Sequence, residues 1–195
     1  YSSLFNHHVT RKIAACENKG LTGDKHLWVT TEKLHGANTA IYTNGEVVRF
    51  ARRKGFIGPD ENHYGFRTIS DRLLQPTSDL YETIRSVLPT YGEGVDTISI
   101  VGELFGEGVL PGMNYGKKEL ALFDIRVHLK DGTIKYLPLT QVQGLCRGSG
   151  FECVPVLKYG TFYECMAVAN DGVSAYAPEG AKAFEDLEEG DESPR

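Results

Sequence analysis

The sequence predicts an α+β domain in which most strands pair antiparallel. Three observations support this fold class. Strand-forming and helix-forming segments follow one another without the regular alternation of a βαβ repeat. Two dipeptides typical of hairpin turns, Asn44-Gly45 and Asp131-Gly132, each stand between two strand-like runs. The 195 residues are enough for one domain with a substantial core, and no internal repeat divides them.

The elements can be assigned in order along the chain. Runs of apolar, β-branched and aromatic residues predict strands near residues 27–32, 38–43, 46–52, 97–104, 119–127 and 133–138. Helical patterns predict helices over residues 9–17, 66–75, 79–88, 140–148 and 161–169. Pro76 separates the second helix from the third, because proline lacks the amide hydrogen that a helix interior uses.

Composition bears on the class of protein. No apolar run reaches the length of a membrane-spanning helix, and the N-terminus lacks the charged and apolar regions of a signal peptide. The sequence begins without methionine, so we expect it to have been trimmed. The four cysteines show neither C-x-x-C nor Cys/His metal spacing: Cys16, Cys146, Cys153 and Cys165. We therefore expect reduced thiols in an intracellular protein without membrane contact.

The net charge of −5 has a local origin. Residues 179–195 hold seven acidic and two basic residues, so the remaining 178 residues carry 19 of each sign. This acidic segment has few apolar groups, and we expect it to be a loop or a solvated tail after a domain over residues 1–178. The bases of the domain gather in two groups, which suits binding to phosphates: Arg49, Arg52, Arg53 and Lys54, then Lys117 and Lys118.

Lys33 is the first candidate functional residue. A strand-like run ending at Thr31 delivers this lysine into a turn, and Gly36 follows three residues later. A neutral lysine is a nucleophile; because the ordinary lysine pKa is about 10.4, such a site needs desolvation or nearby positive charge. A solvated lysine in a hairpin turn is the alternative for an isolated K-x-x-G.

The longer string Glu32-Lys33-Leu34-His35-Gly36-Ala37-Asn38 resembles the nucleotidyl-acceptor motif of ATP-dependent RNA ligases of the phage RNA ligase 2 and RNA-editing ligase type. The resemblance implies that Lys33 attacks the α-phosphate of ATP and carries AMP as a lysyl–AMP adduct. DNA ligases and capping enzymes usually have Asp-Gly where this chain has His35-Gly36, so the histidine favours an RNA ligase.

Further segments are similar to the same family, in the same order, over roughly residues 1–160. They are Tyr1–Leu4 with Asn6-His7, Gly20–Gly23, Phe50–Gly55, Val101–Gly106 and Leu122–Ile125. The implied fold is the nucleotidyltransferase, or ligase adenylation, fold: two antiparallel sheets around a nucleotide pocket, with flanking helices.

The resemblance also implies roles for single residues. Phe123 would stack on adenine, where an ordinary core phenylalanine is the alternative. Glu103 would contact the ribose, or a metal ion through water, where an exposed strand-end acid is the alternative. Arg53 would grip a phosphate with its guanidinium group.

The remaining nucleotide contacts would come from the motif around the lysine. Glu32 would accept a hydrogen bond from the adenine amino group, Asn38 would hold the ribose or a phosphate, and His35 would lie near the phosphates. Leu34 is the last residue that we expect to contribute to nucleotide binding. Asn and His also make local hydrogen bonds in turns, which is the alternative for both. The segment His63–Phe66 lies where members of the family have aromatic residues that contact the nucleic-acid strand. A loop anchored by aromatic residues is an equally good interpretation.

These observations predict an RNA ligase that joins 3′-hydroxyl and 5′-phosphate ends with ATP and Mg²⁺, acting in RNA repair on a nicked duplex or bridged ends. The alternatives are a DNA ligase or capping-type nucleotidyltransferase, and a non-catalytic nucleotide- or RNA-binding module. The family also has a later Glu-Gly motif that opens a strand and a Lys-x-Lys motif after it. Glu179-Gly180 and Glu189-Gly190 are not followed by strand-forming residues, so we accept neither as that motif and expect the domain to lack its last strands here. The expected location is the cytoplasm, a virus-infected cell or the mitochondrion; the sequence leaves the oligomeric state open.

Overall fold

The computed structural model describes residues 10–87, 94–111, 115–169 and 172–177. The chain divides into two compact units. One consists of residues 1–33 together with 155–195, and the other of residues 34–154. The boundary therefore falls between Lys33 and Leu34, inside the motif that the sequence singles out.

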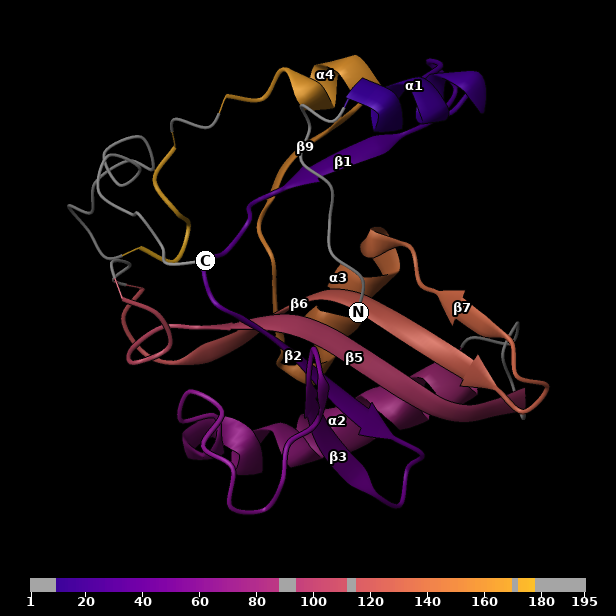
Figure 1. Ribbon diagram of the computed structural model, residues 1–195. Coiled ribbons are helices and arrows are strands. Elements are labelled where there is room, and N and C mark those ends of the chain that lie inside the picture. Colours follow the sequence, from indigo (N-terminus) through magenta and orange to yellow (C-terminus); the bar gives the residue numbers. More distant parts are fainter. Residues whose placement is uncertain (1–9, 88–93, 112–114, 170–171, 178–195) are drawn as a thin grey trace. The chain divides into compact units, whose positions relative to one another are not determined.

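The second unit is built on a seven-stranded sheet with the order β4-β3-β2-β5-β6-β7, in which β8 pairs with β6 (Figure 1). Its strands are β2 (Ala37–Thr43), β3 (Val48–Arg52), β4 (Gly55–Phe56), β5 (Val95–Phe105), β6 (Glu119–Leu129), β7 (Ile134–Tyr136) and β8 (Glu152–Cys153). All neighbouring pairs are antiparallel except β6 and β8, which are parallel. The expectation of antiparallel sheets is confirmed apart from this short pair.

Two helices, α2 (Arg67–Val87) and α3 (Leu139–Ser149), supply the main core together with one face of this sheet. Figure 1 shows α2 running across the sheet below β2 and β5. Alternate strand residues such as Ile41 and Ile100 are fully buried in this core, as period-two alternation requires. We call the opposite side the second face of the sheet. There a separate small cluster packs around Ala40, Ala51 and Val101.

The prediction of two helices separated at Pro76 is wrong, because α2 runs without interruption through this proline. Proline removes one amide donor and crowds the carbonyl four residues earlier, which costs about 3 kcal/mol in a helix interior. Burial of apolar side chains on both sides offsets this cost, since Leu73 and Leu80 both lie in the main core. The hydroxyl of Thr77 also donates to the carbonyl of Leu73 at 2.6 Å.

The first unit contains a two-stranded antiparallel sheet of β1 (Trp28–Thr31) and β9 (Val156–Gly160), with α1 (Thr10–Asn18) and α4 (Phe162–Met166). The rings of Trp28 and Phe162 meet edge to face at 4.9 Å between centroids. A capping box starts α4, because Thr161 and Glu164 satisfy each other's backbone amides. The hydroxyl of Tyr163 in α4 donates to Glu17 in α1 at 2.8 Å.

The α+β class and most predicted elements are confirmed, with some local differences. The sequence did not predict the short strands β4 and β8 or the strand β9. The last helix ends at Met166 rather than residue 169. The hairpin at Asn44-Gly45 has a four-residue loop, in which the Asn44 side-chain oxygen accepts the amides of Glu46 and Val47. The acidic segment 179–195 and residues 1–9 lie outside the described residues.

None of the helices in the described ranges is both long and apolar enough to cross a membrane. None of the four cysteines, which all lie in the described ranges, forms a disulfide bond.

Candidate functional site

Glu32 and Lys33 follow β1 in the first unit. The side chain of Lys33 is exposed. Glu32 is 7% exposed, and its amide donates to the carbonyl of Pro155 at 2.9 Å. Its carboxylate oxygen Oε2 accepts the amide of Ala175 at 3.2 Å, whereas Oε1 has no hydrogen-bond partner among the described residues. A buried carboxylate oxygen without a donor is costly, so Glu32 is suited to accept a hydrogen bond from a ligand.

The second unit begins with the turn Leu34–Gly36. Leu34 is buried, whereas the side chain of His35 is exposed. The amide of His35 donates to the hydroxyl of Tyr115 at 3.1 Å, which fixes the turn. A Cβ atom on Gly36 would clash with the carbonyl oxygen of Leu104 and would also lie 3.0 Å from the Glu103 side chain. Only glycine therefore allows β5 to approach the turn so closely.

Asn38 and Glu103 are direct neighbours on adjacent strands. They are paired in the antiparallel register of β2 and β5. Alternation along each strand places both on the second face, because Ala40 and Val101, two residues away, belong to the cluster on that face. Both side chains are half-buried. An amide and a carboxylate thus stand side by side at the end of β2 that follows the lysine motif.

Phe123 occupies a β-bulge on β6. The register of β5 with β6 pairs Val101 with Asp124 and Gly102 with Leu122, so Phe123 is the extra residue. Bulges of this kind re-aim side chains and are common next to active sites. The half-buried ring packs against the cluster on the second face rather than in the main core. Phe123 therefore shares the sheet face of Asn38 and Glu103.

Arg53 is exposed in the turn between β3 and β4. Its neighbour Arg52 forms an ion pair with Glu61, with 2.6 Å between Nε and Oε1. The hydrogen bond from Arg52 lowers the pKa of the Glu61 carboxyl below its ordinary value. Of these two adjacent arginines, Arg53 is the one whose guanidinium group faces solvent without an acidic partner among the described residues.

The aromatic loop after β4 is anchored from within. His63 is buried and forms a 3.0 Å hydrogen bond with the Thr39 hydroxyl, and burial lowers its pKa. The ring of Phe66 is buried at 4.9 Å from that of Phe50. These two residues therefore fit the structural alternative. Tyr64 differs, because its ring is exposed and its backbone adopts a positive φ of 50°.

Glu103 is the candidate for a metal contact. Mg²⁺ prefers oxygen ligands and usually binds through one or two carboxylates, several waters and substrate phosphates. Glu103 supplies one carboxylate on the second face, where the register of β5 with β6 also places Asp124, opposite Val101. Among the described residues, no group of three or more His, Cys, Asp or Glu side chains is placed to hold a metal ion by itself.

The second unit thus brings three predicted site residues together on one sheet face: Asn38, Glu103 and Phe123. Arg53 stands one residue beyond Arg52, which pairs with Thr39 next to Asn38. Sequence analysis missed Tyr115 as a support for His35. Its contact spans 80 positions, and no local pattern could have indicated it.

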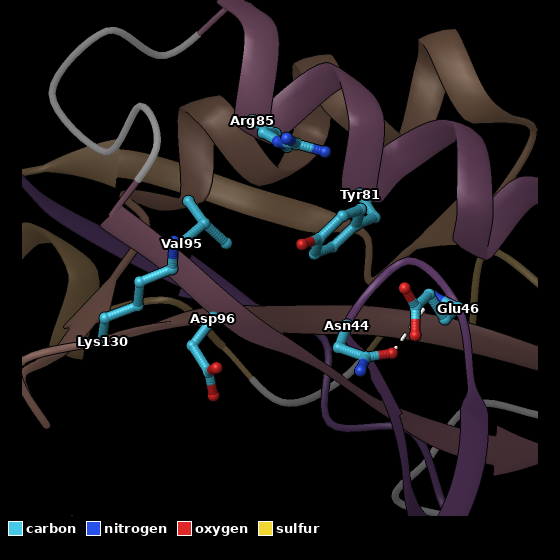
Figure 2. Close-up of a pocket in the computed structure, with 7 residues that line it drawn as sticks. All are labelled: Asn44, Glu46, Tyr81, Arg85, Val95, Asp96 and Lys130. Carbon is cyan, nitrogen blue, oxygen red and sulfur yellow. Dashed lines mark hydrogen bonds between the residues drawn. The ribbon is translucent and has the colours of Figure 1, made fainter.

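A surface pocket of about 400 Å³ lies at the other end of β2 and β5 (Figure 2). Its lining residues are Asn44, Glu46, Tyr81, Arg85, Val95, Asp96 and Lys130. Tyr81 explains the glycine in the adjoining loop, since a Cβ atom on Gly45 would lie 2.6 Å from its ring. None of the predicted site residues lines this pocket, and its two acids balance its two bases.

Sequence comparisons place the chain among known ligases. The family model described as RNA ligase matches residues 26–193. Over 100 residues the chain is 34% identical to the mitochondrial RNA-editing ligase 1 of Trypanosoma brucei brucei, which covers 49% of this chain and 20% of that protein. The mitochondrial RNA-editing ligase 2 of the same organism is 33% identical over 98 residues, covering 49% of this chain and 22% of the relative.

Solved structures agree on the fold. A variant of Naegleria gruberi RNA ligase with ATP and Mn superposes with a TM-score of 0.64 at 17% identity, over 90% of this chain and 49% of that one. Another variant of the same ligase, with AMP and Mn, superposes with a TM-score of 0.61 at 17% identity, over 91% of this chain and 49% of that one. The predicted ligase adenylation fold is thereby confirmed.

The chain spans about half the length of these solved ligases, and its match covers about a fifth of the trypanosome ligases. The family model nevertheless covers well over half of the chain, from residue 26 to residue 193. The chain belongs to the RNA ligase family.

Proposed function

We propose that the chain is the adenylyltransferase part of an ATP-dependent RNA ligase and that Lys33 carries AMP during the reaction. One observation supports this most directly: the lysine motif leads into β2, whose Asn38 lies beside Glu103 on the sheet face that also presents Phe123. A nucleophile, a polar pair and an aromatic ring are the parts that a nucleotide-transferring site needs.

Each residue has a role that its surroundings support. The ring of Phe123 offers adenine a stacking surface, and the buried Oε1 of Glu32 accepts a hydrogen bond from the adenine amino group. Asn38 and Glu103 contact the ribose hydroxyls. Arg53 contacts a phosphate, and solvent exposure leaves its guanidinium group accessible. Leu34 and His35 border the phosphates.

The proposed reaction has three steps. The neutral amine of Lys33 attacks the α-phosphorus of ATP, a nitrogen–phosphorus bond forms, and pyrophosphate leaves. An oxygen of the RNA 5′-phosphate then attacks the same phosphorus and frees Lys33. Finally the 3′-hydroxyl attacks the 5′-phosphate, loses its proton, and AMP leaves. Catalysis of such transfers rests largely on positioning and on stabilising charge.

ATP and a divalent cation, Mg²⁺ in our proposal, are the expected cofactors. When bound, the cation neutralises phosphate charge. Glu103 would hold it through water, because it offers a carboxylate on the sheet face of Asn38 and Phe123.

RNA is the proposed nucleic-acid partner, as a nicked duplex or bridged ends in RNA repair. The names of the trypanosome relatives support RNA and make the mitochondrion one proposed intracellular location. The proposed domain is residues 1–178, followed by the acidic segment.

A sealing assay tests the proposal. A nicked RNA duplex with a labelled 5′-phosphate is incubated with ATP, Mg²⁺ and the protein. The expected products are the adenylylated strand and then the sealed strand, and Lys33→Ala should give neither from a free 5′-phosphate. Sealing of a matched DNA nick in preference to RNA would instead identify a DNA ligase.

A further inference from the structure

An exposed aromatic ring lies at one edge of the large sheet, just after the turn that holds Arg53. Phe56 in the edge strand β4 is 46% exposed. The guanidinium carbon of Arg49 lies 3.7 Å from the centroid of its ring. The ring of Tyr42 meets it edge to face, with 5.5 Å between centroids. We call Tyr42, Arg49 and Phe56 the edge platform.

Strand register places the edge platform on the second face. Tyr42 pairs with Arg49, and Phe56 pairs with Ala51. Ala51 belongs to the small cluster on that face, and Tyr42 packs against it. The platform thus faces the same side as Asn38, four residues before Tyr42. At about 3.3 Å per strand residue the two stand about 13 Å apart along β2.

The charge around the edge platform is favourable for a polyanion. Arg52 is already paired with Glu61. Arg49 and Lys54 remain, both exposed, and Arg53 lies between Lys54 and the paired arginine. Positive side chains that follow a strand edge, interleaved with aromatic rings, are typical of surfaces that bind single nucleic-acid strands.

Protection of the sheet edge is the structural alternative. Short length and flanking charge alone protect an edge strand from pairing with other chains, and β4 has only two residues, directly preceded by Lys54. Protection therefore does not require a phenylalanine with nearly half of its surface in water. A planar guanidinium group stacked on an aromatic ring does offer what a nucleobase needs, a flat surface with cation–π character.

We propose that the edge platform stacks a nucleobase of the RNA strand, with Lys54 contacting the strand's phosphates. The proposal rests on the proposed function only in taking the bound nucleic acid to be RNA. It adds a subsite for RNA that is separate from the nucleotide contacts of Phe123 and Glu103.

The test compares four variants: Phe56→Ala, Phe56→Trp, Lys54→Ala and Tyr136→Ala. Tyr136 is the matched control, because it is 60% exposed on β7 at the opposite edge of the same sheet. Fluorescence anisotropy measures the affinity for a labelled single-stranded RNA, and circular dichroism confirms that each variant is folded. In parallel, labelled ATP measures adenylation of Lys33.

Phe56→Ala should weaken RNA binding about tenfold, as expected for the loss of one stacked base. Phe56→Trp and Tyr136→Ala should stay within about twofold of the parent chain. Lys54→Ala should make the slope of log affinity against log salt concentration shallower, by about the amount that one phosphate contact contributes. Adenylation should be unchanged in Phe56→Ala.

Unchanged RNA affinity in a folded Phe56→Ala protein would overturn the proposal. So would a joint loss of adenylation and RNA binding, which would assign Phe56 to the nucleotide pocket. Polyglutamate that competes with RNA on the parent chain but not on Phe56→Ala would identify an acidic polypeptide as the partner, and would also overturn it. If the parent chain binds RNA through Phe56 but takes no AMP on Lys33, the proposed function fails while the platform stands.

Discussion

Asn38 on β2 and Glu103 on β5 lie directly opposite each other, on the sheet face turned away from the main core. The two positions are 65 residues apart in sequence. Hydrogen bonding between the strands fixes their register, and Gly36 lets β5 approach the turn that carries the lysine motif. This pairing joins two sequence motifs into one polar pair.

Replacing Glu103 with glutamine tests the polar pair. Glutamine has nearly the same size, so the fold should persist while the charge is lost. We expect ATP affinity in the presence of Mg²⁺ to fall by about 1.5–3 kcal/mol, the range for a hydrogen bond to a charged group. Isothermal titration calorimetry with and without Mg²⁺ measures this. An affinity equal to that of the parent chain would show that Glu103 contacts neither ribose nor cation.

Removing the ring of Phe123 tests the stacking role. We expect Phe123→Ala to weaken ATP binding by about 1–3 kcal/mol, the scale of base stacking on an aromatic ring, and Phe123→Tyr to preserve most of it. Calorimetric titration with ATP gives the affinities. A purely structural role would appear as a lower melting temperature with ATP affinity intact in the folded fraction.

A matched pair of alanine substitutions tests the close approach at Gly36. Gly36→Ala should destabilise the protein by about 1–3 kcal/mol, because its Cβ atom meets the backbone of Leu104. Gly144→Ala in the middle of α3 meets nothing within 4 Å and should stabilise by about 0.5–1 kcal/mol. Urea unfolding measures both. Equal effects of the two substitutions would contradict the contact.

The buried His63 predicts a pH dependence of stability. Burial lowers the pKa of His63 in the folded protein below the ordinary 6.5. At a pH between the folded pKa and 6.5, the unfolded chain therefore binds a proton that the folded chain does not. The contribution of neutral His63 to the free energy of unfolding is complete above pH 6.5. It is lost as the pH falls toward the pKa of His63 in the folded protein. Burial and the nearby Arg126 also lower the pKa of His128, so part of the pH dependence of stability comes from His128.

Urea unfolding at pH 7.5 and pH 5.5 checks this prediction for His63. His63→Gln can keep a hydrogen bond to Thr39 but does not titrate. The loss of unfolding free energy on acidification should therefore be smaller in His63→Gln than in the parent chain. An equal loss in both proteins would assign the pH dependence to other groups.

The sequence predicted the fold class, which is confirmed, and a set of candidate site residues, because both predictions depend on local patterns. Hairpin dipeptides and strand alternation are local, and so are the motifs around Lys33, Glu103 and Phe123. The failures have non-local causes. Helix α2 continues through Pro76 because its two halves share one buried face, which tertiary packing decides.

Two features of the site could not be read from the sequence. The bulge at Phe123 becomes visible only when β6 is paired with β5, because it is a property of the register and not of either strand. The pairing of β9 with β1 likewise joins segments far apart in the chain, so neither shows its partner. The roles of the site residues remain predictions that the measurements above address.

Intact-protein mass spectrometry decides whether Lys33 accepts AMP. The protein is incubated with ATP and Mg²⁺, denatured, weighed and digested for tandem mass spectrometry. We predict a gain of one AMP residue located on Lys33, which pyrophosphate reverses and which both Lys33→Ala and Lys33→Arg abolish, since a guanidinium group stays protonated. AMP on a different residue would remove Lys33 from the mechanism. No covalent AMP on a chain that still binds ATP would favour a non-catalytic nucleotide-binding domain.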